Sequence, residues 1–267
     1  MVVTVVAEAR SREQVIVEPT PGLTIPNPIR SAALARPEHA ALVAAGQTWS
    51  AGDLLDAVVR CAGVLARAGV EPGHVVALAG PGSAEWVVAF HALGWLGAAV
   101  APLPTGGTPD ELEAALDALT PTRVLLCHGL APAARAALVA RGARFLTELE
   151  PGPAPAERAW PLDEARAVVL TSGSTAAPRP VTLTTGQLLL SAFGSALRLG
   201  HDPEDRWLAC LPLHHVGGLS ILVRCALYGT TVLLHDRFDP RRVARTLDAG
   251  DASLVSLVPA MLERVLD

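Results

Sequence analysis

Two short apolar runs, residues 167–170 and 181–183, enclose the polar segment Thr171-Ser172-Gly173-Ser174-Thr175-Ala176-Ala177-Pro178-Arg179-Pro180. The runs have the length and composition of buried strands. Four hydroxyl groups and a glycine give the segment short donors and accessible backbone N–H groups, which can surround a polyphosphate without bulky side chains. Arg179 adds a fixed positive charge. The same composition also occurs in plain solvated loops, so both interpretations stay open on this segment alone.

Two common nucleotide-binding motifs are absent from the sequence. No Gly-Lys-Ser/Thr follows the polar segment, and no Gly-x-Gly-x-x-Gly follows the early strand-like runs. P-loop and dinucleotide-binding folds are therefore disfavoured.

Strand-like and helix-like stretches alternate along the whole chain. Ser50 with Asp53 predicts a capped helix through Ala68, Ser83 predicts a second helix, and Thr108 a third. A fourth begins at Thr184 or Thr185. Further helices are expected at 218–227, at 240–247 and from residue 259, and strands at 75–79, 124–127, 167–170, 181–183, 207–211, 231–234 and 254–258. The alternation predicts an α/β fold of layered parallel sheets joined by crossover helices.

The Pro- and Ala-rich residues 150–161 predict an exposed connection within one larger unit. We therefore expect an N-terminal extension at 1–26 and one domain at 27–267, with sub-halves at about 27–150 and 162–267.

The composition excludes several classes of protein. The 267 residues are 51% hydrophobic, which is enough for a large core, and the net charge of −5 gives no broad basic field for nucleic acid. All 21 basic residues are arginine. The four cysteines are scattered without metal-ligand spacing, which predicts free thiols. The N-terminal residues lack the basic-then-apolar layout of a secretory signal, so we expect a cytoplasmic protein. Residues 86–102 are apolar but too short and broken to span a membrane, so we expect a buried helix followed by a strand there.

A second polar marker has the sequence Leu211-Pro212-Leu213-His214-His215-Val216-Gly217-Gly218-Leu219. It follows a predicted strand, where side chains of an α/β sheet face a crevice. We predict no metal site, because neighbouring residues on a strand point oppositely and no third ligand is evident. A structural role for His214, hydrogen-bonded beneath the loop, remains the alternative.

The first segment resembles the phosphate loop of the adenylate-forming (AMP-binding, acyl-CoA synthetase) superfamily, Thr-Ser-Gly-Ser/Thr-Thr-Gly-x-Pro-Lys-Gly. Residues 171–175 and Pro178 match this pattern, while Ala176, Arg179 and Pro180 depart from it. The resemblance implies that ATP phosphates are bound by Thr171, Ser172, Gly173, Ser174, Thr175 and Arg179. Arg179 replaces the flexible lysine ammonium of the motif with a planar guanidinium. Ala176 and Pro180 replace two glycines, which should stiffen the loop.

The second marker resembles the superfamily's Pro-Leu-x-His-x-x-Gly motif, which matches Pro212, Leu213, His215 and Gly218. Residues 218–222 and 256–259 also resemble o-succinylbenzoate-CoA ligases. In that subfamily the histidine lies in the acyl pocket, so the resemblance implies a catalytic and substrate-binding role for His215 and a substrate contact for Gly218. Arg224 would face the substrate's carboxylates; a solvated helix arginine is the alternative.

The resemblance implies an incomplete N-terminal domain of an adenylate-forming enzyme that uses ATP, Mg²⁺ and CoA. It would activate o-succinylbenzoate, or a related carboxylic acid, as acyl-AMP and transfer it to CoA in menaquinone biosynthesis. The expected partners are these small molecules and, in a homodimer, a second copy of the chain, with no nucleic acid and no membrane span.

Later motifs of the superfamily, including a catalytic lysine on a C-terminal lid domain, do not occur in residues 1–267. We therefore expect turnover to need a further C-terminal part. The alternatives are another fatty or aryl acid-CoA ligase, or a non-catalytic truncated remnant that binds nucleotide weakly.

Overall fold

The computed structural model describes residues 22–104, 106, 108–171 and 178–267. The helices in these residues are α1 (Pro28–Ala35), α2 (Ala51–Arg67), α3 (Ala84–Leu96), α4 (Pro109–Leu119), α5 (Pro132–Ala140), α6 (Thr185–Leu199), α7 (Val216–Tyr228), α8 (Pro240–Asp248) and α9 (Pro259–Leu266). The strands are β1 (Thr24–Ile25), β2 (Ala40–Ala44), β3 (Gln47–Ser50), β4 (Val75–Ala79), β5 (Ala99–Pro102), β6 (Arg123–Leu126), β7 (Arg144–Phe145), β8 (Trp160–Pro161), β9 (Ala165–Thr171), β10 (Arg179–Thr184), β11 (Arg206–Ala209), β12 (Thr231–Leu234) and β13 (Leu254–Val255). A 3-10 turn, η1 (Leu146–Glu148), follows β7.

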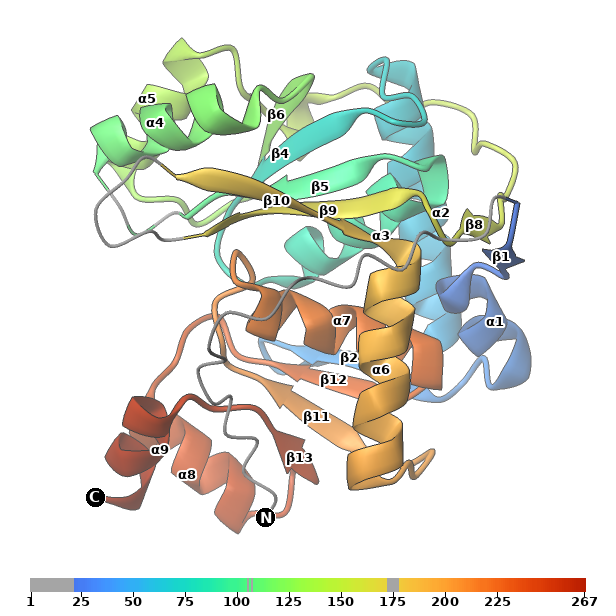
Figure 1. The fold of residues 1–267 in the computed structure, drawn as a ribbon, viewed down its shortest axis with the longest axis vertical. Coiled ribbons are helices and arrows are strands. Elements are labelled where there is room, and N and C mark those ends of the chain that lie inside the picture. Colours follow the sequence, from blue (N-terminus) through green and yellow to red (C-terminus); the bar gives the residue numbers. More distant parts are fainter. Residues whose placement is uncertain (1–21, 105, 107, 172–177) are drawn as a thin grey trace, which may run out of the picture.

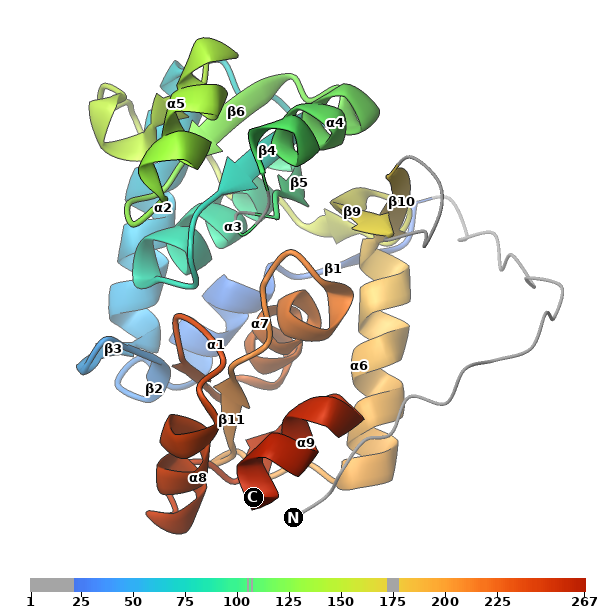
Figure 2. The same cartoon turned by 90° about the vertical axis from the view of Figure 1, so that its left-hand side faces the viewer.

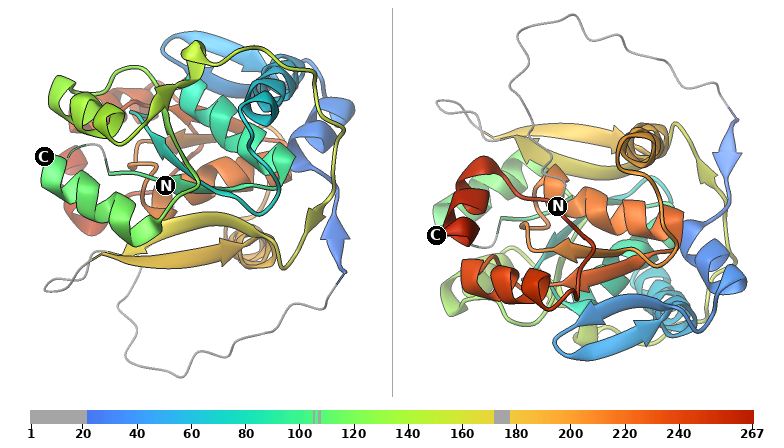
Figure 3. Two further views of the ribbon diagram at one scale, coloured as in Figure 1. Left: turned by 90° about the horizontal axis from the view of Figure 1, so that it is seen from above. Right: turned by 90° about the horizontal axis from the view of Figure 1, so that it is seen from below.

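One sheet has six strands in the order β10-β9-β5-β4-β6-β7. Its neighbours are parallel except for β9 and β10, which pair antiparallel. The connection at 172–178 is too short for the crossover of a dozen or more residues that a parallel pair needs. The hairpin therefore adds an antiparallel edge to the predicted parallel sheet, and Figure 3 shows it at the rim of the molecule from above and below.

The other large sheet has five strands in the order β13-β11-β12-β2-β3, parallel except for the β2–β3 hairpin. Residues 40–50 thus join a sheet formed otherwise by residues 206–255, while β9 and β10 join the sheet that contains β4 to β7. The boundary expected between sub-halves at about 150–162 does not coincide with the division between the sheets. Apolar pairing explains why β2 joins the five-stranded sheet, because Leu42 lies beside Val232 and Ala44 beside Leu234.

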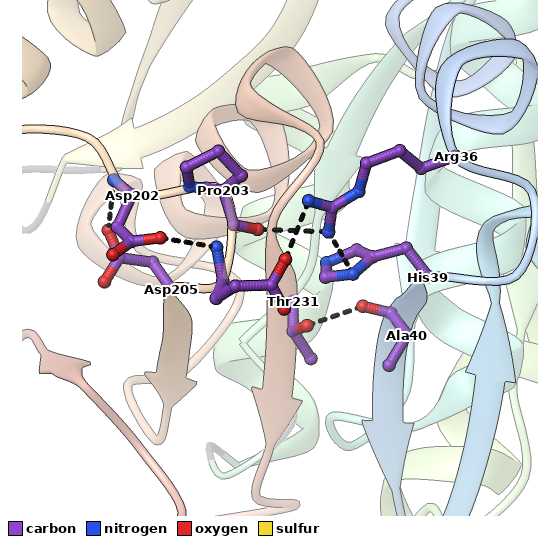
Figure 4. Close-up of polar contacts among 8 residues, drawn as sticks. Arg36, His39, Ala40, Asp202, Pro203, Asp205 and Thr231 are labelled. Atoms are coloured by element: carbon purple, nitrogen blue, oxygen red, sulfur yellow. Dashed lines mark hydrogen bonds and ion pairs between the residues drawn. The ribbon is translucent and has the colours of Figure 1, made fainter.

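Polar contacts reinforce the attachment of β2 to the rest of the five-stranded sheet (Figure 4). Arg36 follows α1, donates to the carbonyl of Pro203 at 3.2 Å and pairs with Glu204 at 2.9 Å. The Thr231 hydroxyl donates to the carbonyl of Ala40 at 2.5 Å. The segment at 36–40 is therefore fixed to the loop before β11 and to β12.

The elements form layers, as Figures 1 and 2 show. Helices α4 and α5 cover the outer face of the six-stranded sheet, where they share an apolar cluster with β4 and β5. Helices α2, α3 and α7 lie between the two sheets in the largest cluster, and α8 and α9 cover the five-stranded sheet. Helix α3 is apolar all round because it is enclosed on both sides. The expected buried helix and following strand within residues 86–102 are confirmed as α3 and β5.

The helix starts expected from local sequence are confirmed. Ser50 with Asp53, and Thr108 with Glu111, form capping boxes at α2 and α4, and Ser83 caps α3. Helix α6 begins after Thr184, which forms a capping box with Gln187. These starts depend on contacts within one turn, which local sequence specifies well.

The connection at 150–161 is largely exposed but packed onto the helices. A Cβ on Gly63 of α2 would lie 2.5 Å from the carbonyl oxygen of Gly152, so the two backbones approach too closely for a side chain. The indole N–H of Trp95 donates to the carbonyl of Pro155 at 3.3 Å. At its end, β8 pairs with β1, so the last residues of the expected extension at 1–26 form a strand. Within the described residues, no helix is both long and apolar enough to cross a membrane.

Candidate functional site

The β9–β10 hairpin holds the two ends of the polar loop together. Thr171 and Arg179 are directly paired across the hairpin, and the Thr171 hydroxyl donates to the carbonyl of Arg179 at 3.2 Å. Both side chains are exposed, and Arg179 forms no ion pair with any described residue. The other predicted phosphate-binding residues, Ser172, Gly173, Ser174 and Thr175, lie outside the described residues.

Residues 210–215, which we call the histidine loop, connect β11 to α7, as expected. His215 is the residue before the first turn of α7, and its carbonyl accepts the N–H groups of Gly218 at 3.1 Å and Leu219 at 3.0 Å. Its side chain is exposed. The ring centroids of His214 and His215 are 4.2 Å apart. The expectation that these side chains point oppositely is wrong, because they lie in a turn rather than on a strand.

The charge state of His214 follows from its position. Burial, and then the neighbouring His215, lower its pKa from the ordinary 6.5 to about 4. His214 is therefore neutral at pH 7. Within the part of the chain that the structure describes, no group of three or more His, Cys, Asp or Glu side chains could hold a metal ion.

Gly218 is required by backbone packing. A Cβ at this position would lie 2.4 Å from the carbonyl oxygen of Pro212 and 2.8 Å from that of Leu211. The histidine loop therefore lies directly on the first turn of α7, and any side chain at 218 would displace it. This close contact gives a structural reason for the glycine of the motif. Its role at the substrate stays a prediction.

A groove of about 660 Å³ lies between α6, α7 and residues 256–258. Figure 1 shows α6 crossing in front of α7, from the edge of the six-stranded sheet toward β11. We call this feature the α6–α7 groove; its lining residues are Leu183, Gln187, Leu188, Ser191, Gly194, Ser195, Arg198, Leu199, Leu211, Val216, Gly217, Ser220, Arg224, Ser256, Leu257 and Val258. The walls are largely apolar, with polar groups at separate points, as is usual for small-molecule sites. Of the predicted substrate residues, Arg224 lines the groove, whereas His215 and Gly218 do not.

Arg224 is half-buried in this groove, so it is not the solvated helix arginine of the alternative interpretation. Its guanidinium carbon lies 4.4 Å from the ring centroid of Trp207, and its Nη2 donates to the Ser220 hydroxyl at 3.5 Å. Its Nε is buried without a hydrogen-bond partner. Burial lowers the pKa of Arg224 from its ordinary value, although an arginine stays charged at neutral pH. No ion pair between described residues includes it.

Several groove residues were not predicted from sequence. Gln187, Ser191, Ser195 and Arg198 lie along one face of α6, at a spacing that the helical repeat could have indicated. Trp207, which contacts Arg224 without lining the groove, gave no such signal, because a tryptophan in a buried strand is ordinary core. Its role depends on the neighbouring strand, where the indole N–H donates to Ser256 at 3.1 Å.

The comparisons with known proteins agree with this fold. The family model for AMP-binding enzymes matches residues 29–267, so the chain belongs to this family. The chain is 34% identical over 233 residues to a 2-succinylbenzoate–CoA ligase from Listeria monocytogenes, covering 86% of this chain and 49% of that protein. The corresponding ligase from Geobacillus kaustophilus is 33% identical over 246 residues, covering 91% and 50%. The chain thus spans about half the length of the curated relatives it matches.

Solved structures give the same result. The o-succinylbenzoate coenzyme A synthetase of Bacillus subtilis, in complex with ATP and a magnesium ion, matches with a TM-score of 0.84 and 31% identity over 91% of this chain and 52% of that chain. The same protein in complex with the acyl-adenylate intermediate matches with a TM-score of 0.82 and 31% identity over 91% and 64%. The predicted superfamily and fold class are confirmed.

Proposed function

We propose that this chain supplies the ATP-binding and acid-binding part of an adenylate-forming acid-CoA ligase that acts on o-succinylbenzoate in menaquinone biosynthesis. In this reaction a carboxylate oxygen of the acid attacks the α-phosphorus of ATP, and pyrophosphate leaves. The thiol sulfur of CoA then attacks the acyl carbon, AMP leaves, and the thiol proton is released. Four free cysteines fit a reducing cytoplasm as the place of this reaction.

The nucleotide side of the proposal rests on the β9–β10 hairpin. Thr171 and Arg179 stand at the two ends of the hydroxyl-rich loop, and Arg179 has no acidic partner among the described residues. A cation so placed is available to polyphosphate. Mg²⁺ usually retains waters and binds through substrate phosphates with few carboxylates, so it needs no protein cage of acids here. When bound, it would neutralise charge on the phosphates.

The acid side rests on the observation that carries the proposal, which is the unpaired Arg224 in the α6–α7 groove. A half-buried guanidinium without a carboxylate partner favours an anionic ligand. The reacting carboxylate of the acid is consumed at the phosphate, so a cation in the acyl groove suits a second carboxylate. o-Succinylbenzoate carries two carboxylates and an aromatic ring, which fits the apolar walls.

Calorimetry with ATP and Mg²⁺ tests the nucleotide side in the 267-residue chain. We expect measurable binding that Ser174→Ala weakens several-fold and Arg179→Gln weakens further, because hydroxyl and cation contacts to phosphate are lost. Ser31→Ala is the matched control, since Ser31 is an exposed residue of α1. Equal binding by the Ser174 and Ser31 variants would contradict a working phosphate loop.

A panel of acids tests the acid side. We expect o-succinylbenzoate to bind more tightly than benzoate or octanoate, because only the first fills the groove and offers a second carboxylate to Arg224. Tighter binding of octanoate would favour a fatty acid ligase. Binding of no acid and no ATP by the folded chain would favour a remnant without catalytic function.

A further inference from the structure

Arg224 is held mainly by an aromatic ring. Its Nη2–Ser220 hydrogen bond is at the limit of length, at 3.5 Å, and its Nε has no partner. The contact with the Trp207 ring, at 4.4 Å from the ring centroid, is therefore the main restraint on the guanidinium among the described residues. Cation–π contacts of this kind contribute about 0.5–2 kcal/mol, depending on solvent exposure.

The Trp207 ring is in turn held by its neighbours. The side chain is 3% exposed, and its residue pairs with Leu254 where β11 and β13 run in parallel. Two residues after Leu254, the Ser256 hydroxyl accepts the indole N–H at 3.1 Å. Ser256 also lines the α6–α7 groove. A chain of contacts thus leads from the groove wall through the indole to the guanidinium.

The geometry of stacking decides which part of Arg224 remains free. A ring beneath the guanidinium occupies its flat face, while the five N–H donors lie in the guanidinium plane. An acidic partner would occupy those in-plane donors and neutralise the charge. Trp207 does neither, so the terminal N–H donors that Ser220 does not accept stay free for a carboxylate, which can accept two hydrogen bonds.

We infer that Trp207 and Ser256 are positioning residues that hold the Arg224 guanidinium open toward the groove and so select acids with a second carboxylate. The inference rests on the proposed function. If Trp207 were only a core residue, its replacement would lower stability and weaken the binding of mono- and dicarboxylic acids by the same factor. A positioning role instead affects the dicarboxylic acid alone.

The test compares o-succinylbenzoate with 3-benzoylpropionate, the same keto acid without the ring carboxylate, by calorimetry on the 267-residue chain. We expect the wild type to prefer the dicarboxylic acid about tenfold or more, as a charge-assisted hydrogen bond provides. Ser256→Ala should lower this ratio several-fold and Trp207→Leu should bring it near one, with the affinity for 3-benzoylpropionate unchanged. Trp207→Phe keeps a ring face without the N–H, so its ratio should match that of Ser256→Ala.

The controls separate the inference from the proposed function. Arg224→Gln should abolish the preference; a preference that survives it would overturn the assignment of the acid site itself. If Arg224→Gln abolishes the preference while Trp207→Leu and Ser256→Ala retain it, only the positioning role is overturned. Thermal unfolding of each variant confirms folding, and Ser256→Ala carries the test if Trp207→Leu does not fold.

Discussion

Arg166 is buried and Arg224 is half-buried, and their partners differ. Arg166 is 3% exposed and donates to the Thr185 hydroxyl at 2.9 Å, to the carbonyl of Gly94 at 2.9 Å and to Glu164. It also stacks on Trp160 at 4.3 Å. A buried cation with satisfied donors is structural, whereas Arg224, with donors to spare, is suited to a ligand.

Replacement of Arg166 tests its structural role. Arg166→Leu should lower the free energy of unfolding by about 3–5 kcal/mol, because it removes bonds between β9, α3 and α6 and leaves Glu164 without its buried partner. Urea denaturation measures the loss. Arg67→Leu breaks an exposed pair with Glu150 and should cost far less. Equal losses in both variants would contradict the structural role.

His91 makes stability depend on pH. Burial lowers its pKa in the folded chain to about 3, against an ordinary 6.5. The unfolded chain therefore binds a proton that the folded chain rejects, and the stabilising contribution, complete above pH 6.5, is lost progressively as the pH falls toward 3. His91→Gln should show a shallower fall of unfolding free energy from pH 6.5 to 4. An unchanged slope would contradict the burial of a neutral imidazole.

Among the elements, α6 connects the fold to the site. Leu188 and Ala192 face the core, while Leu190, Phe193 and Leu197 are exposed. Gln187, Ser191, Ser195 and Arg198 line the α6–α7 groove from an adjoining face, and Leu188 borders both the core and the groove. The helix start is specified locally, by Thr184, whereas the groove exists only because α7 lies against α6.

Two substitutions in α6 should change stability in opposite directions. Thr184→Ala removes the capping box with Gln187 and should cost about 1 kcal/mol. Gly194→Ala should gain up to about 1 kcal/mol, because a Cβ there meets nothing within 4 Å and alanine favours the helix. Chemical denaturation of both variants gives the measurement. A loss at Gly194→Ala or a gain at Thr184→Ala would contradict the structure of α6.

The elements predicted from sequence were those with local signals. Ser50, Thr108 and Thr184 mark helix starts through contacts within four residues, and the prediction of these helices is confirmed. The β2–β3 hairpin, α1 and α5 were not predicted. The strand at 40–44 gains its stability from a distant partner, β12, which no local pattern identifies, and the strand at 47–50 pairs with 40–44 in turn.

As with the helices and strands, the parts of the site that could be predicted were those with a local sequence motif. The motifs placed Thr171 and Arg179 in a loop between two strands and His215 just before a helix. The structure has Thr171 at the end of β9, Arg179 at the start of β10 and His215 directly before α7, while their roles in binding remain predictions. The Trp207–Ser256 contact could not be predicted, since it joins residues 49 positions apart. Arg224 was ambiguous in sequence, because the burial that makes it a ligand candidate comes from Trp207 and α6.

The whole molecule is interlocked by strand exchange between its sheets. The β2–β3 hairpin lies in one sheet, and the next strand in the chain, β4, lies in the other. The largest apolar cluster includes residues from both sheets and from the helices between them. We therefore expect unfolding as one unit, with the same midpoint by tryptophan fluorescence and by far-ultraviolet circular dichroism.

A fragment provides the complementary measurement. Residues 22–150 alone lack β9 and β12, which are the neighbours of β5 and β2, so the fragment should show no cooperative transition. Two separate transitions in the whole chain, or a cooperatively folded fragment, would contradict this interlocking.

The preference of the chain for an acid with a second carboxylate tests the central claim most directly. Calorimetric titration of the wild type and of Arg224→Gln with o-succinylbenzoate and 3-benzoylpropionate gives two affinity ratios. We predict a ratio of about ten or more in the wild type and near one in the variant, because Arg224 is the half-buried cation of the α6–α7 groove, whereas Arg198 is exposed to water. Equal ratios in the two proteins would contradict the assignment of this groove to the acid.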